Sequence, residues 1–234
     1  MLGGLYAKKP DVSNLLAQEI GQLLTKFLSK WYYFYRAHLL WNSSPLNLFH
    51  LPITLIKSYS KWYHYDNIAP ALLGGLQLMQ PGGSCVPLPF FENWLLVLYH
   101  PGIKISTRMA RDILPKNLPR GAVIPYWQKL AGFIRGLYTG DQALAESLLY
   151  DDVIEPYRAN LIPRFEEGKK AAREAGAVAF GIAGSGPTCF AIVHSMDKAV
   201  AVQSALVREM KGTQESFSKI CTLSPQGARV LKEM

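Results

Sequence analysis

The sequence contains few cysteines and no long apolar run. Its three cysteines, Cys85, Cys189 and Cys221, are far apart and show no C-x-x-C spacing, which excludes a disulfide framework and a zinc site. We expect reduced, partly buried thiols. No run of about 18 uncharged apolar residues occurs, so we expect no membrane-spanning helix. The first residues lack the basic segment and apolar core of a signal peptide, and we therefore expect a cytoplasmic protein.

Two common nucleotide-binding motifs are also absent. The sequence contains neither G-x-G-x-x-G between a strand and a helix nor the Walker loop G-x-x-x-x-G-K-[ST]. This excludes a Rossmann dinucleotide site and a P-loop nucleotide site. No internal repeat is evident, which argues against a solenoid or propeller.

Most of the net positive charge of the chain lies in its first quarter. The 234 residues are 49% hydrophobic and 18% charged, as in a globular protein, with a net charge of +8. Residues 1–62 carry seven basic residues against two acidic ones, whereas the other 172 carry 18 against 15. A peripheral membrane or nucleic-acid-binding protein is an alternative that rests on this first quarter alone. Because no basic stripe follows it, we expect neither nucleic acid nor membrane as a partner.

Aromatic residues are concentrated in the same quarter. Residues 1–62 hold 11 of the 27 aromatic residues, including the run from Trp31 to Tyr35. An amphipathic helix is predicted from Asn14 to about Trp41, but no single helix face could bury that run. We expect residues 1–62 to be an atypical N-terminal segment.

From residue 63 onward the pattern predicts alternating strands and helices. Strands are expected at residues 72–79, 94–99, 177–183, 188–193 and 218–223, and helices at 106–113, 126–138, 143–149, 164–175 and 197–210. Helices on an antiparallel sheet in this order indicate an α+β fold, with a ferredoxin-like C-terminal domain that carries extra helices.

Two segments combine residues that could bind a small polar substrate. The first contains His64, Asp66 and Asn67 before an expected strand, where they could orient a ligand by hydrogen bonds. A turn in which the Asp and Asn side chains bond their own backbone is the alternative. The second places Thr107 and Arg111 on one helix face, where the arginine could bind a carboxylate in a bidentate manner. The alternative is an ordinary helix cap beside a solvated arginine.

Two further segments complete the set of candidates. Glu155-Pro156-Tyr157-Arg158 places a second arginine beside a proline, and a surface ion pair between Glu155 and Arg158 is the alternative. The segment from Gly181 to Thr188 contains three glycines between two apolar runs, so its backbone could approach an anion closely. A plain glycine hairpin is the alternative.

Taken together, these segments resemble the later part of homoserine kinase, in the superfamily that also includes galactokinase and mevalonate kinase. The resemblance covers roughly residues 63–234 and rests on HYDNIAPALLGGLQLM, LLVLYHPGIKISTRMARDILP, LAGFIRGLY, DDVIEPYR, GIAGSGPTCFAIV and LSPQGARVL. It implies that residues 63–90 are the remnant of an N-terminal kinase domain and residues 91–234 the C-terminal α+β domain.

The resemblance also implies a reaction and roles for residues. It implies transfer of the γ-phosphoryl group of ATP to the hydroxyl of L-homoserine, with Mg²⁺, as a step of threonine biosynthesis. It also makes a homodimer a possible state of the enzyme. His64 would contact the substrate, Arg111 and Arg158 would bind its carboxylate, and Thr107 would lie near the reacting groups. The remaining carried-over residues would support the site: Asp66, Asn67, Gly181, Gly184, Ser185, Gly186 and Thr188. No metal ligand is assigned.

The sequence departs from the family pattern in residues 1–62. The family has a Pro-Ala-Ser-Ser-Ala-Asn-like segment and a Gly-Leu-Gly-Ser-Ser-rich phosphate loop, and neither is matched by Gly3-Gly4 or Asn42-Ser43-Ser44-Pro45. We expect a truncated, impaired kinase in which a misassigned or frameshifted reading frame replaces the N-terminal region. A non-catalytic homoserine-binding or regulatory remnant is the alternative function.

Overall fold

The computed structural model describes residues 65–80 and 84–228, with side chains from Ala69 onward. The helix expected from Asn14 to about Trp41 lies outside these residues, as does His64. None of the helices in the described ranges is long and apolar enough to cross a membrane.

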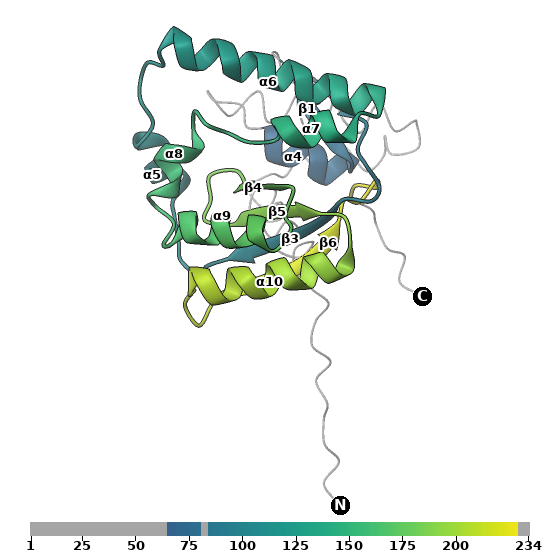
Figure 1. Ribbon diagram of the computed structural model, residues 1–234. Helices are drawn as coiled ribbons and strands as arrows, with labels where there is room; N and C mark the ends of the chain where they lie inside the picture. The colour runs from purple at the N-terminus through teal and green to yellow at the C-terminus, as the bar shows by residue number, and fades with distance from the viewer. Residues whose placement is uncertain (1–64, 81–83, 229–234) are drawn as a thin grey trace, which may run out of the picture.

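A four-stranded antiparallel sheet organises most of the described chain (Figure 1). Its strands lie in the order β4 (Ala179–Ile182), β5 (Cys189–Val193), β3 (Leu95–His100) and β6 (Phe217–Thr222). Strand β3 is central because it pairs with β5 through Val97 and Ala191 and with β6 through Val97 and Ile220. This strand order and the intervening helices are those of the expected ferredoxin-like α+β fold, and the prediction of the fold class is confirmed.

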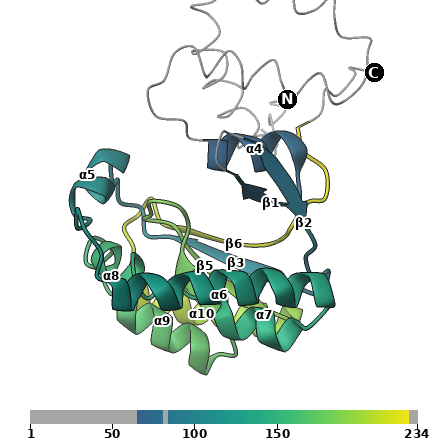
Figure 2. The same ribbon diagram turned by 90° about the horizontal axis from the view of Figure 1, so that it is seen from above.

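Each face of this sheet is covered by a pair of helices. On one face, α9 (Phe165–Glu174) and α10 (Met196–Met210) pack against a core that includes Val97, Val193 and Leu206. On the other face, α6 (Arg120–Thr139) and α7 (Gln142–Leu148) pack around Leu137 and Ile192. Figure 2 shows α6 and α7 lying side by side along the sheet. Side chains that alternate along each strand therefore enter two separate cores.

Two short helices lie beyond the end of the sheet. Helix α5 (Thr107–Asp112) follows β3, and α8 (Glu155–Ala159) precedes α9. Both views place α5 and α8 near each other (Figures 1 and 2). These are the elements that carry the two predicted arginine segments.

A smaller unit precedes the large sheet. Helix α4 (Tyr65–Leu73) leads into a two-stranded antiparallel sheet of β1 (Leu76–Met79) and β2 (Cys85–Leu88). The tail after β6 holds this unit, because the Gly75 N–H donates to Ser224 O at 2.7 Å and the Ala228 N–H donates to Ala71 O at 2.9 Å. The boundary predicted at residue 90 stays a prediction.

Two predicted elements need correction. Residues 72–79 were expected to form one strand, but α4 continues to Leu73 and β1 begins only at Leu76, because Gly74 and Gly75 both adopt positive φ and end the helix. Helix α6 begins at Arg120 rather than at residue 126. Pro125 is the sixth residue of α6, and because it lacks an N–H the helix forgoes one backbone hydrogen bond there without ending.

The cysteines are free thiols, as expected. Cys189 is buried and Cys85 and Cys221 are half-buried. Burial raises the pKa of Cys189 to about 12, and the nearby carboxylate of Glu155 adds to this effect. Cys189 is therefore an inert core thiol at neutral pH.

Candidate active site

The local sequence fixes helix α5 at its first turn. The Ser106 hydroxyl accepts a hydrogen bond from the Met109 N–H at 3.1 Å, so Ser106 is the N-cap and Thr107 is the first helical residue. Ala110 is fully buried and holds the helix against the protein. Thr107 and Arg111 lie four residues apart on the exposed part of α5, as predicted.

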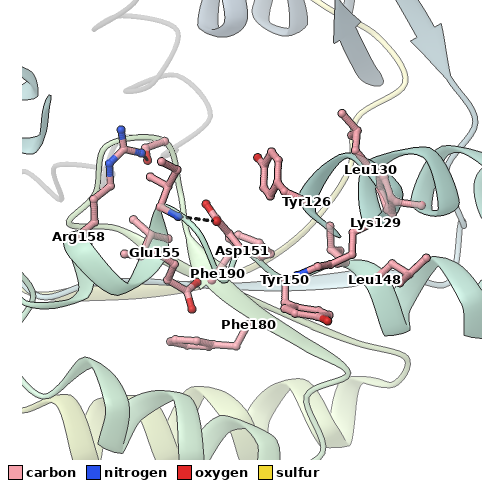
Figure 3. Close-up of a pocket in the computed structure, with 16 residues that line it drawn as sticks. Tyr126, Lys129, Leu130, Leu148, Tyr150, Asp151, Glu155, Arg158, Phe180 and Phe190 are labelled. Carbon is pink, nitrogen blue, oxygen red and sulfur yellow. Dashed lines mark hydrogen bonds between the residues drawn. The ribbon is translucent and has the colours of Figure 1, made fainter. Parts of the chain in front are cut away.

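Helix α8 is only five residues long and begins in a capped turn. One carboxylate oxygen of Asp151, Oδ1, accepts hydrogen bonds from the Val153 and Ile154 N–H groups at 2.9 and 2.8 Å. The bond to Ile154 is drawn in Figure 3. This turn directs the chain into α8 and places Arg158 one turn after Glu155.

Arg158 links three elements of the site. Its Nη1 donates to Gly184 O at 2.8 Å, in the loop between β4 and β5, and its Nε lies 3.5 Å from Ala110 O, in α5. The structure therefore brings together three of the four predicted segments: the α5 segment, the α8 segment and the glycine loop.

The glycine loop has the backbone freedom that its sequence predicts. Gly184 and Gly186 have φ values of 59° and 80°, in the left-handed region that favours glycine. The Ala183 N–H donates to Thr188 O at 2.8 Å and closes the hairpin. Within the described part of the chain, the N–H groups of Gly184 and Ser185 make no hydrogen bond to protein. A Cβ added at Gly184 would meet no protein atom within 4 Å, so an anion has room to approach these amides.

Gly181 is a glycine for a different reason. It is buried in β4, and a Cβ there would lie 3.2 Å from Glu155 Oε2 and 3.1 Å from the Phe190 ring. The conformation of Gly181 does not require glycine, but the close approach of these two side chains favours it.

A cavity of about 280 Å³ opens beside these residues (Figure 3). Arg158 lies at one end, Lys129 and Leu130 of α6 lie at the other, and Asp151 lies between them. Aromatic rings form much of its wall, contributed by Tyr126, Phe133, Tyr150, Phe180 and Phe190. The cavity thus combines an apolar wall with charged groups at both ends, which suits a small polar ligand with an aliphatic part.

The sequence did not identify the charged residues on this wall. Glu155 was considered as a surface partner of Arg158, but its side chain is 5% exposed and its Oε1 lies 2.5 Å from Lys169 Nζ of α9. Burial raises the pKa of Glu155, and Lys169 only partly offsets this effect. Lys129 pairs with Asp152 and lies 4.2 Å above the Tyr150 ring. These pairs are visible only in the folded structure, because residues such as Glu155 and Lys169 are 14 positions apart in the sequence.

The first predicted segment does not join the other three in the described structure. Asp66 and Asn67 lie in the first turn of α4, a helix rather than the turn that was the alternative reading. Figures 1 and 2 both show α4 apart from α5 and α8. His64 lies outside the described residues, so its predicted substrate contact stays a prediction.

The described residues do not assemble a metal site. Within residues 65–80 and 84–228, no cluster of three His, Cys, Asp or Glu side chains could hold a metal ion. This part of the chain therefore provides arginines and backbone amides for anions, and no ready ligand set for Mg²⁺.

Comparison with known families identifies the second half of the fold. Residues 133–212, which run from α6 through α10, match the family described as GHMP kinases C terminal. This part of the chain is therefore similar to the C-terminal domain of GHMP kinases. The match contains α8, the glycine loop and most of the cavity wall, so the candidate site lies largely within this domain.

Solved structures extend the similarity beyond this domain. A homoserine kinase from Cytophaga hutchinsonii is 34% identical over 71% of this chain and 54% of its own, with a TM-score of 0.67. A proposed homoserine kinase from Listeria monocytogenes, at 22% identity with a TM-score of 0.52, shares the fold over 73% of this chain and 56% of its own. A mevalonate kinase from L. major, at 17% identity with a TM-score of 0.53, does so over 74% and 56%. The chain thus spans only about half the length of these proteins.

Proposed function

We propose that this GHMP-type chain provides the amino-acid-binding part of an ATP-dependent homoserine kinase. Its acceptor would be L-homoserine, whose carboxylate is bound by Arg111 and Arg158 while its hydroxyl lies near Thr107. One observation carries the proposal. Arg158 contacts both the backbone of α5 and the glycine loop, in a chain whose sequence is 34% identical to that of a homoserine kinase.

The chemistry of phosphoryl transfer suits the residues present. The acceptor hydroxyl oxygen forms a bond to the γ-phosphorus of ATP, the bond from that phosphorus to the bridging oxygen breaks, and ADP leaves while the hydroxyl proton passes to solvent. Enzymes accelerate this reaction mainly by positioning and charge stabilisation, so no strong base is required. Two guanidinium groups on one carboxylate would contribute about 1.5–3 kcal/mol for each charge-assisted bond, which selects an amino acid over a simple alcohol.

One feature of the described structure could bind the phosphates of ATP. The N–H groups of Gly184 and Ser185, with open space beside Gly184, fit a phosphoryl oxygen or another anionic group. Magnesium, when bound, would neutralise charge on the phosphates, and we assign no residue to it. The cytoplasmic location, the place in threonine biosynthesis and the homodimer stay predictions.

Release of ADP tests the proposal. The purified chain is incubated with ATP, Mg²⁺ and L-homoserine, and Arg111→Ala is compared with Arg108→Ala, which removes an arginine of the same helix whose side chain is 91% exposed. We expect homoserine-dependent ADP release that is lost in Arg111→Ala and kept in Arg108→Ala. Homoserine-independent release, or equal loss in both variants, would contradict the proposal.

A non-catalytic homoserine-binding protein is the second candidate. It is favoured by the absence from the sequence of a segment resembling the family's phosphate loop. Binding of L-homoserine without binding of ATP, measured by calorimetry on the same preparation, would identify this function.

A further inference from the structure

A buried ion pair anchors the helix that carries Arg158. Helix α8 has only five residues, too few to be stable through its own hydrogen bonds. Tertiary contacts must therefore fix its position. The contact at its first residue is between Glu155 and Lys169 of α9, with Oε1 and Nζ 2.5 Å apart and side chains only 5% and 22% exposed.

The second carboxylate oxygen of Glu155 faces strand β4. A Cβ at Gly181 would lie 3.2 Å from Oε2, a tight contact, so the carboxylate lies between α9 and the strand that leads into the glycine loop. The acids Asp151 and Glu166 also act on this carboxylate, as does Lys169, and the carboxylate in turn helps to raise the pKa of the buried Cys189 thiol. Lys169 is the one cation among these neighbours.

Arg158 lies one helical turn after Glu155 and makes the contacts at the other end of α8. It donates to Gly184 O at 2.8 Å and approaches Ala110 O. Any movement of α8 would therefore displace Arg158, the glycine loop and the contact with α5 together.

We propose that Glu155 and Lys169 are positioning residues, which hold α8 so that Arg158 and the glycine loop are aligned for an anionic group of the ligand. The role in ligand binding rests on the proposed function, whereas the role in alignment rests on the contacts alone. The Glu155–Lys169 pair acts through Arg158 and Gly184 and does not itself contact substrate.

Backbone hydrogen exchange in the intact chain tests the alignment directly. In Lys169→Met, which leaves the Glu155 carboxylate buried without its cation, we expect exchange in residues 154–160 and 181–188 to rise about tenfold or more while α10 is unchanged. Glu155→Gln should act in the same direction. Lys169→Arg, which keeps the charge and the donors, should restore slow exchange.

Lys170→Met is the matched control. Lys170 is the next residue of α9, has a 78% exposed side chain and pairs only loosely with Glu174. We expect exchange in this variant to equal that of the wild type. Unchanged exchange in residues 154–160 and 181–188 of Lys169→Met would overturn the proposal, and so would an equal rise in α10, which would mean that the pair only stabilises the whole fold.

Calorimetry with L-homoserine separates this inference from the proposed function. We expect Lys169→Met to weaken binding about tenfold or more, and Lys169→Arg and Lys170→Met to bind like the wild type. If the wild type does not bind L-homoserine, the proposed function fails, and the exchange measurement still decides whether the pair aligns α8. Faster exchange with unchanged affinity would overturn the role of the alignment in binding.

Discussion

Gly181 shows how one missing side chain shapes the candidate site. A methyl group added there would lie 3.2 Å from the Glu155 carboxylate and 3.1 Å from the Phe190 ring, so one of these neighbours would have to shift by a few tenths of an ångström. A substitution there must displace a buried side chain, and buried overpacking usually costs about 1–3 kcal/mol.

We predict that Gly181→Ala lowers the free energy of unfolding by about 1–3 kcal/mol, measured by urea denaturation. Gly121→Ala is the control, because Gly121 lies in α6 and a Cβ there meets no atom within 4 Å. The control should be neutral or stabilise by up to about 1 kcal/mol. Equal stability of both variants would mean that the space around Gly181 is not tight.

The half-buried Glu146 and the buried Glu155 should affect stability with opposite signs as pH changes. Burial acts to raise the pKa of Glu146, but hydrogen bonds from Trp94, Gln142 and His194 outweigh it and lower that pKa below its ordinary value of 4.5. Burial raises the pKa of Glu155 above 4.5, and the bond from Lys169 offsets this only in part. Relative to an exposed glutamate, folding thus favours the anion of Glu146 and the neutral acid of Glu155, while Lys169 still stabilises the ionised form of Glu155.

The signs follow from these directions. The stability that Glu146 contributes is present above pH 4.5 and is lost as pH falls through its lower folded pKa, whereas the contribution of Glu155 is present below pH 4.5 and is lost as pH rises through its raised folded pKa. We measure unfolding free energies of the wild type, Glu146→Gln and Glu155→Gln from about pH 3 to about pH 7. The advantage of the wild type over Glu146→Gln should grow with pH, and that over Glu155→Gln should shrink. Two trends of the same sign would contradict the assignment.

At the scale of elements, the N-cap of α5 connects folding to ligand binding. The Ser106 hydroxyl satisfies the Met109 N–H and so defines the start of the helix that carries Thr107 and Arg111. A lost N-cap costs about 1 kcal/mol. Because α5 has only six residues, its end should fray when this bond is removed.

We predict that Ser106→Ala lowers stability by about 1 kcal/mol and also weakens L-homoserine binding. Ser106→Asp should restore both, because an aspartate also caps. Ser195→Ala is the matched variant, since Ser195 caps the remote helix α10 through the Lys198 N–H. It should lose stability and keep its affinity for L-homoserine. Loss of affinity in both variants would show that α5 has no special role.

The elements also show what the sequence can predict. Helix α10 was expected because Ala199, Val202, Leu206 and Met210 recur at helical spacing, and all four are buried. The hairpin of β4 and β5 was expected from two apolar runs around glycines. The start of α6 was predicted six residues late, since the helix continues through Pro125 although a proline lacks the N–H of one backbone hydrogen bond.

The site was only half predictable for a physical reason. Arg111, Arg158 and the glycine loop stand out because their residue types have specific chemistry. Glu155 and Lys169 do not stand out, because charged residues are common in any sequence. They become informative only when the structure shows that the two side chains are paired away from solvent. The pairing of distant residues across α8, α9 and β4 is a property of the packed fold.

At the scale of the whole molecule, the chain after β6 joins the small unit to the large sheet. A Cβ at Gly74 would lie 2.4 Å from the backbone of Gln226, and one at Gly227 would lie 2.1 Å from Leu72 O. Two glycines thus allow backbones far apart in sequence to touch. This contact explains why the LSPQGA segment belongs with the α4–β1 segment, and it makes the described part of the chain one connected structure.

The central claim is that this connected structure binds an amino acid through Arg111 and Arg158. Titration calorimetry of the intact chain with L-homoserine tests it most directly, comparing the wild type with Arg111→Ala and Arg108→Ala. We predict binding by the wild type, a loss of about tenfold to about 150-fold in Arg111→Ala, as expected for charge-assisted bonds, and unchanged affinity in Arg108→Ala. A folded wild type that binds no L-homoserine, or an Arg108→Ala variant that loses as much as Arg111→Ala, would contradict the account.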